Sequence, residues 1–388
     1  MENLKVKAII ADVFEEIAQG LETGLFHDKV ALGLTLYGSE LGASNLLKGA
    51  ETFAKDNADV EVVLIGPKVE TDLTLIEVES EELQYDKMEE LLDSGRIQGC
   101  VTMHYSFPIG VSTVGRTLTP GFGKEMYVAT TTGTSSAHRN EAMVKNAISG
   151  IIAAKAAGIQ EPSLGILNVD GARTVERALK ELSAGGYPIN FADSDRSDGG
   201  CVMRGNDLLR GTPDIMVTDT LTGNILMKTF SSYHTGGNFE AVGDGYGPGI
   251  GQDFDRLVLI LSRVSGSPVV ANALAYAKDL VLGDVHKLSK KEYKKAKDAG
   301  LEEILAGLTK TKEKAQEEEV TAPAEEITTG EISGIDILEL EDAVRVLWKE
   351  GIYASSGMGC TGPVVMVNES KIGVASQILA AAGYVSED

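Results

Sequence analysis

The chain has 388 residues, and its composition narrows the classes of protein to which it can belong. A hydrophobic content of 43% and a charged content of 24% are typical of a soluble globular protein. The length predicts two domains and an appendage. The net charge of −23 disfavours nucleic acid and anionic membranes as partners, because a phosphate-rich surface requires a basic footprint. Neither a long apolar run nor a charged-then-apolar leader is present, which predicts a chain that neither spans a membrane nor is secreted.

The chain carries three cysteines, Cys100, Cys201 and Cys360, which lie far apart and form no C-x-x-C pair. An odd number at this spacing excludes a disulfide framework, and the absence of a C-x-x-C pair argues against a zinc site built from cysteines. Free thiols are typical of a reducing cytosol, so we expect a cytoplasmic protein. The sequence contains no cofactor fingerprint, and we expect neither a metal nor a cofactor.

Residues 1–28 predict an amphipathic helix, and from residue 29 strands alternate with helices. The predicted strands cover residues 30–36, 60–65, 99–104, 127–131, 164–169 and 215–219. The predicted helices cover residues 44–55, 140–157, 174–182 and 269–281, and a further one ends at 94. This alternation predicts an α/β domain over residues 29–285 with a mostly parallel sheet and helices on both of its faces.

The composition changes at residues 286–330, where runs of lysine and glutamate precede a Pro/Ala stretch. This pattern predicts a charged, partly helical segment that ends in a linker. Residues 331–388 predict a small α/β unit with a helix over 335–350, two short strands, and a last helix that begins after Asn368. A unit of this size buries little apolar surface, so we expect it to dock through Trp348, or through Ile372 and Leu379, on the main domain or a partner.

Cys360 is the first catalytic candidate, because glycines 357, 359 and 362 surround it on a predicted loop between two strands. Open backbone amides stabilise a thiolate, and they can later hold the oxyanion of a thioester under attack. The alternative is a tight turn that contains a small residue. Cys100, at the end of a predicted strand, is a second catalytic candidate, and its alternative is a buried small side chain.

Two predicted strand ends carry groups that suit phosphate. Asp219 ends one strand, and Thr222, Gly223 and Asn224 follow it at a helix start, where amides, a hydroxyl and a carboxamide can form an anion pocket. The alternative is an ordinary turn with Thr222 as the helix cap.

The second strand end carries Ser135, Ser136, His138 and Arg139. These side chains suit phosphate binding, with His138 as a proton carrier, and the alternative is capping hydroxyls beside two surface bases. Ligands of parallel sheets bind at the carboxyl ends of the strands, where both motifs are predicted.

Two glycine-rich segments imitate nucleotide-binding loops. Residues 243–251 have glycine at every second position, do not match G-x-G-x-x-G, and predict a flexible lid. Residues 110–117 resemble a phosphate-binding loop but carry Arg116 in place of the essential lysine, and Pro120 follows where a helix would be needed.

Residues 29–66, 129–171 and 210–229 resemble the phosphate acyltransferases of fatty-acid and phospholipid synthesis. The resemblance rests on Leu164-Gly-Ile-Leu-Asn-Val-Asp-Gly171 and on Val217-Thr-Asp-Thr-Leu-Thr-Gly-Asn-Ile-Leu-Met-Lys228. It implies a three-layer α/β/α fold of the isocitrate/isopropylmalate dehydrogenase type. It also implies the conversion of an acyl thioester and inorganic phosphate into an acyl phosphate, and it adds Asn168 to the phosphate-binding candidates.

The sequence around Cys360, together with the acidic linker, resembles the alpha subunits of component C of the glycine/sarcosine/betaine reductase complex. This resemblance implies that Cys360 carries an acetyl group, that selenoprotein A delivers a carboxymethyl group, and that phosphate releases acetyl phosphate. It also implies a larger beta subunit as a partner. The choice among glycine, sarcosine and betaine belongs to other components.

Two alternatives stay open. One is a phosphate acyltransferase that acts directly on an acyl thioester without a covalent cysteine. The other is a non-catalytic scaffold subunit that holds the other components.

Overall fold

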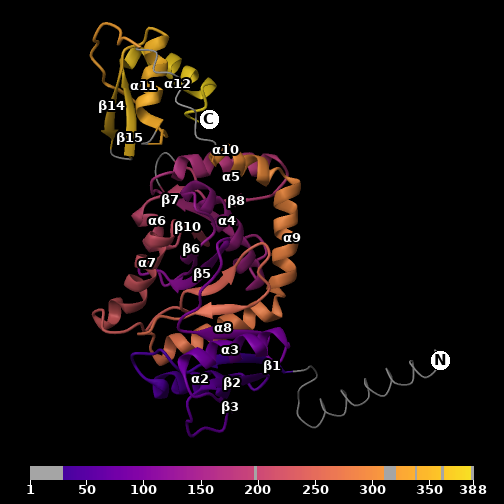
Figure 1. The fold of residues 1–388 in the computed structure, drawn as a ribbon. Helices are drawn as coiled ribbons and strands as arrows, with labels where there is room; N and C mark the ends of the chain where they lie inside the picture. Colours follow the sequence, from indigo (N-terminus) through magenta and orange to yellow (C-terminus); the bar gives the residue numbers. More distant parts are fainter. Residues whose placement is uncertain (1–28, 196–198, 310–319, 337–338, 360–361, 386–388) are drawn as a thin grey trace, which may run out of the picture.

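The computed structural model describes residues 29–195, 199–309, 320–336, 339–359 and 362–385. The helix predicted for residues 1–28 and the candidate Cys360 lie outside the described residues. The main domain is built on one sheet in the order β3-β2-β1-β4-β12-β11-β5-β6-β10-β7-β8, with β9 beside β7 (Figure 1).

The strands of this sheet are β1 (Val30–Thr35), β2 (Val60–Gly66), β3 (Thr74–Glu77), β4 (Gly99–Thr102), β5 (Val111–Leu118), β6 (Glu125–Thr134), β7 (Ser163–Leu167), β8 (Asn190–Phe191), β9 (Val202–Met203), β10 (Ile215–Val217), β11 (Gly247–Ile250) and β12 (Val258–Ile260). The helices of the main domain are α2 (Ala43–Asp56), α3 (Glu81–Asp93), α4 (Arg139–Ala156), α5 (Ala172–Ala184), α6 (Gly205–Arg210), α7 (Thr220–Ser232), α8 (Ser267–Leu282), α9 (Val285–Asp298) and α10 (Leu301–Thr309).

Alternating side chains of the strands divide the core into two layers. Leu32 and Leu34 of β1 belong to one buried cluster, with side chains from α2, α4, α5, α8 and α9. Ala31 belongs to the other, with side chains from α3 and α7. The pairings along the sheet are parallel except those of β11 with β12 and β5, and that of β5 with β6. The predicted three-layer fold with a mostly parallel sheet is therefore confirmed.

Both glycine-rich segments contribute central strands, so the lid interpretation of residues 243–251 is wrong. A Cβ at Gly247 would lie 1.7 Å from the carbonyl oxygen of Val114, and one at Gly249 would lie 2.2 Å from the ring of Phe107. The glycines are therefore needed for close packing within the sheet. Arg116 is a buried anchor of β5, because it pairs with Asp244 and, at 2.9 Å, with Asp279.

Helices α9 and α10 form the first part of the segment predicted to be a charged connection. Tyr293 and Ala296 of α9 and Leu301 and Ile304 of α10 are buried in the core of the main domain. The many lysines of α9 obscure this apolar stripe in the sequence. The segment therefore packs on the main domain as far as Thr309, where the described residues break off.

The C-terminal unit has its own sheet and its own core. Strands β13 (Gly330–Ser333), β15 (Gly362–Val367) and β14 (Ala354–Gly359) pair antiparallel in that order, and α11 (Leu340–Lys349) and α12 (Ile372–Ala381) complete the unit. Asn368 accepts a hydrogen bond from the amide of Ser370 just before α12, as expected for a cap. Figure 1 shows the unit beside α5 and α10, away from the strands β1 to β3.

The prediction that the unit docks through Trp348, or through Ile372 and Leu379, is wrong for Leu379, which has no exposed surface. Leu379 is buried in the core of the C-terminal unit, where Trp348 and Ile372 pack against it. Trp348 also donates a hydrogen bond of 2.8 Å to the carbonyl of Ala354. The unit therefore satisfies its large apolar side chains internally. Among the described residues, no helix is both long and apolar enough to cross a membrane.

Candidate functional site

The strand order brings three polar segments to one edge of the main sheet. Strand β10 lies between β6 and β7 and is parallel to both, so the carboxyl ends of these three strands are neighbours. The segment after β6 leads to Arg139, the segment after β10 contains Asp219, and the turn after β7 contains Asp170. We call Arg139, Asp170, Asp219 and Thr222 the strand-end cluster.

Asp219 caps helix α7, so Thr222 is not the capping residue. The carboxylate of Asp219 accepts hydrogen bonds from the amide of Thr222 at 3.1 Å and from its hydroxyl at 2.7 Å. Burial raises the pKa of Asp219, but these bonds and the charge of Arg139 outweigh burial and lower the pKa below its usual value. The carboxylate is therefore ionised near neutral pH, and it occupies part of the anion pocket predicted at this helix start.

Arg139 joins the three segments. Its guanidinium lies 3.0 Å from a carboxylate oxygen of Asp219 and 3.6 Å from one of Asp170, and its side chain is 44% exposed. Asp170 was missed at the sequence level, although it stands two residues after Asn168 in the motif at the end of β7. These two carboxylates hold the exposed guanidinium of Arg139 in place. A bound phosphate must therefore share the guanidinium with Asp170 and Asp219.

Gly223 and Asn224 hold α7 against β6. Asn224 donates a hydrogen bond of 2.9 Å to the carbonyl of Thr131, and a Cβ at Gly223 would lie 1.8 Å from the carbonyl oxygen of Thr130. These contacts therefore hold the start of α7, which carries Thr222 of the strand-end cluster, beside β6. The amides of Thr220 and Leu221 at that start have no acceptor within the helix, as in any first turn.

The serines and histidine after β6 have different surroundings. Ser135 is buried, and its hydroxyl is hydrogen-bonded to Ser112 and Asn146 within the core. Ser136 accepts a hydrogen bond from the amide of His138, and the side chain of His138 is exposed beside Arg139. A part for Ser136 and His138 in phosphate binding therefore stays a prediction, whereas the hydroxyl of Ser135 is already engaged within the fold.

Asn168 is exposed directly after β7, and its amide donates to the carbonyl of Met203 on β9. It therefore lies in the same turn as Asp170, at the rim of the strand-end cluster. The structure does not test its predicted part in phosphate binding.

Cys100 and Cys201 are both buried, and burial raises the pKa of each thiol, to about 12 for Cys201. Nearby Glu176 further raises the pKa of Cys201. A catalytic thiol needs a stable thiolate, so neither site favours nucleophilic chemistry. Strand β14 ends at Gly359 and β15 begins at Gly362, and these two glycines pair across the hairpin. The role of Cys360, between them in the sequence, stays a prediction.

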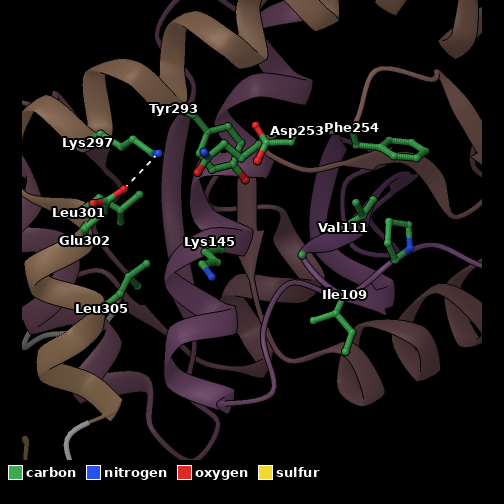
Figure 2. A pocket seen from close by; sticks show the side chains of 13 residues that line it. Ile109, Val111, Lys145, Asp253, Phe254, Tyr293, Lys297, Leu301, Glu302 and Leu305 are labelled. Carbon is green, nitrogen blue, oxygen red and sulfur yellow. Dashed lines mark ion pairs between the residues drawn. The ribbon is translucent and has the colours of Figure 1, made fainter.

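A cavity of about 370 Å³ opens between the start of β5 and helices α4, α9 and α10 (Figure 2). Apolar side chains of Val111, Leu301 and Leu305 and the cation of Lys145 line it, and Lys297 pairs with Glu302 at 3.1 Å on one side. The amide of Gly110, at one wall, donates to the carbonyl of Thr134 at the end of β6. The cavity therefore adjoins the segment that leads to the strand-end cluster.

Replacing Arg139 with alanine is expected to raise the apparent KM for phosphate about tenfold, because one charge-assisted contact is lost. The attachment of an acyl group to the chain, which the sequence resemblance implies, should continue. Arg210→Ala is the matched control, since Arg210 forms an exposed pair with Asp195 at 2.9 Å on the separate helix α6. Steady-state kinetics at varied phosphate concentration measure the effect. An unchanged KM in the Arg139 variant would place the phosphate elsewhere.

Comparisons with known proteins identify the family of this chain and several relatives. The fatty acid synthesis protein family matches residues 30–366. The chain is 62% identical over 382 residues to the glycine/sarcosine/betaine reductase complex component C subunit alpha of Peptoclostridium acidaminophilum, a match that covers 98% of this chain and 99% of that one. A phosphate acyltransferase of Paramagnetospirillum magneticum is 37% identical over 93 residues, which are 22% of this chain and 24% of that one.

Among solved structures, a branched-chain phosphotransacylase from Enterococcus faecalis is similar, with a TM-score of 0.47 and 14% identity. That match covers 65% of this chain and 99% of the other.

Proposed function

Because this chain belongs to the fatty acid synthesis protein family and to the component C alpha subunits of the glycine/sarcosine/betaine reductase complex, we propose that it forms acetyl phosphate from an acetyl thioester. The thioester is carried by Cys360, and inorganic phosphate is the second substrate. The carboxymethyl group from which the acetyl group derives arrives on the selenium of selenoprotein A. The larger beta subunit of component C is the other partner, and the complex works in the cytoplasm.

The reaction is a phosphorolysis. A phosphate oxygen attacks the carbonyl carbon of the thioester, a new C–O bond forms, and the C–S bond breaks with its electron pair on the sulfur of Cys360. The products are acetyl phosphate and the free thiolate. The reaction is fastest when phosphate is held about 3–3.5 Å from the carbonyl carbon in line for attack, because the two reactants then need not meet by a random encounter.

The observation that carries the proposal is the meeting of three segments at the carboxyl edge of β6, β10 and β7. Arg139 lies 3.0 Å from Asp219 there, and the first-turn amides of α7 start at the same place. A guanidinium beside helix-start amides is the combination that binds phosphate in proteins. A bound phosphate depends on Arg139 and these amides, because the net charge of −23 and the carboxylates of Asp170 and Asp219 both oppose an anion here.

The cavity in Figure 2 favours one alternative function. Its volume of about 370 Å³ and its lining, which combines apolar side chains with charged groups of both signs, suit the arm of an acyl thioester bound to a separate carrier. In that alternative, thioester and phosphate meet directly, as in a phosphate acyltransferase, and Cys360 carries nothing.

A mass measurement during turnover separates the two functions. The complete complex is given its substrate without phosphate, and the intact mass of this chain is compared with that of the free chain. We expect a gain of one acetyl group, located by peptide mapping on Cys360 and removed when phosphate is added. An acetyl group on another residue, or none in an active complex, contradicts the thioester on Cys360.

A further inference from the structure

Helix α5 contacts the C-terminal unit through polar side chains. Arg177 donates a hydrogen bond of 2.8 Å to the carboxylate of Glu339 and another of 3.0 Å to the carbonyl of Tyr384. One turn earlier, the hydroxyl of Thr174 lies 3.4 Å from a carboxylate oxygen of Asp336. One face of α5 therefore binds the C-terminal unit at several points.

These contacts reach two separate segments of the unit. Asp336 and Glu339 lie between β13 and α11, whereas Tyr384 follows α12. Two bonds from one guanidinium to separate segments fix the orientation of the unit as well as its position. The side chains of Arg177 and Glu339 are only 25% and 26% exposed, so this pair is screened less than an ordinary surface pair.

The contacted part of α5 is close to the strand-end cluster. Helix α5 begins at Ala172, directly after the turn that holds Asp170, and Asp170 pairs with Arg139. Arg177 stands seven residues after Asp170, which corresponds to about 10 Å along a helix axis. The C-terminal unit therefore docks on the same helix that begins at the strand-end cluster.

We propose that Arg177 docks the C-terminal unit, which carries the acetyl group in the proposed function, on the helix that begins at the strand-end cluster, and that this docking supports transfer of the acetyl group to phosphate there. The inference rests on the proposed function, since it assumes that the hairpin carries the thioester at Cys360. Arg177 touches neither the thioester nor phosphate, so it is a positioning residue. Its effect is to raise the local concentration of one reactant beside the other.

The test compares Arg177→Ala and Arg177→Glu with the wild-type chain in the complete complex. We expect the maximal rate of acetyl phosphate formation to fall about tenfold or more, because two charge-assisted hydrogen bonds are lost. The KM for phosphate should stay unchanged, since Arg139 is intact. The acetylated form of Cys360 should accumulate during turnover, because formation of the thioester continues while its transfer slows.

Two further variants control for folding. Lys180→Ala changes a cation on the same helix that pairs with Glu176 at 3.3 Å, and it should behave as wild type. The charge-reversed double variant R177E/E339R restores an ion pair between positions 177 and 339 but not the hydrogen bond to the carbonyl of Tyr384. It should therefore recover part of the lost rate. Failure of R177E/E339R to recover any rate overturns the role of the Arg177–Glu339 pair.

Small-angle scattering of the isolated chain separates this inference from the proposed function. We expect a larger radius of gyration in Arg177→Glu than in wild type, because the C-terminal unit is released. A scattering profile equal to wild type overturns docking through Arg177, whether or not Cys360 is acetylated. An absent acetyl group with an enlarged radius contradicts the proposed function and leaves docking supported.

Discussion

Replacement of Cys360 by alanine or serine is expected to lower acetyl phosphate formation by at least about a thousandfold, because the group that carries the acetyl is lost. Serine should not substitute for the thiol, since its hydroxyl is hardly ionised near neutral pH, whereas a thiol loses its proton more readily. The rate is measured in the complete complex with saturating phosphate. Retention of most of the rate in both variants favours the direct acyltransferase, in which no covalent intermediate forms.

Cys201→Ala is the matched control, because Cys201 is buried and burial raises its pKa to about 12. We expect it to keep its activity and Cys360 to react first with iodoacetamide in the wild-type chain. A scaffold role predicts a different pattern, in which Cys360→Ala loses activity only if the complex no longer assembles. Size-exclusion chromatography of the complex measures assembly and separates that case from loss of the chemical step.

The architecture of the main domain could be predicted because its signal is local and repeated. Buried strands such as β1 appear in the sequence as short apolar runs, and apolar residues recur with the helical period in the segments between them. Strands β5 and β11 were missed for a physical reason. Their glycines disfavour a strand by intrinsic preference, and only the closeness of Val114 to Gly247 explains why they are required.

The candidate site was predicted in its residues but not in its pairings. Arg139 and Asp219 stand 80 positions apart, and their contact follows from the order of β6, β10 and β7 in the sheet. The spacing of residues in the sequence shows neither the strand order nor that the carboxylate of Asp219 occupies part of the anion pocket predicted at the start of α7. For the same reason, the docking residue Arg177 gave no signal, since its partners Glu339 and Tyr384 follow more than 150 residues later.

Gly223→Ala is expected to lower the free energy of unfolding by about 3 kcal/mol, because the added methyl group enters space held by the backbone. The ideal Cβ would lie 1.8 Å from the carbonyl oxygen of Thr130, and no side-chain rotation can relieve a contact with a carbonyl. Alanine favours a helix over glycine by only about 1 kcal/mol, so the steric cost dominates. Urea denaturation measures the difference, which should appear in the transition midpoint.

Gly307→Ala is the control that isolates the steric cause, since Gly307 also lies in a helix and a Cβ there would meet nothing within 4 Å. It should leave stability unchanged or raise it by up to about 1 kcal/mol. In Gly223→Ala, α7 must move away from β6, so the bond from Asn224 to Thr131 should weaken and phosphate use should fall together with stability. Equal stability of the two variants would show that α7 does not pack on β6 as closely as the 1.8 Å separation implies.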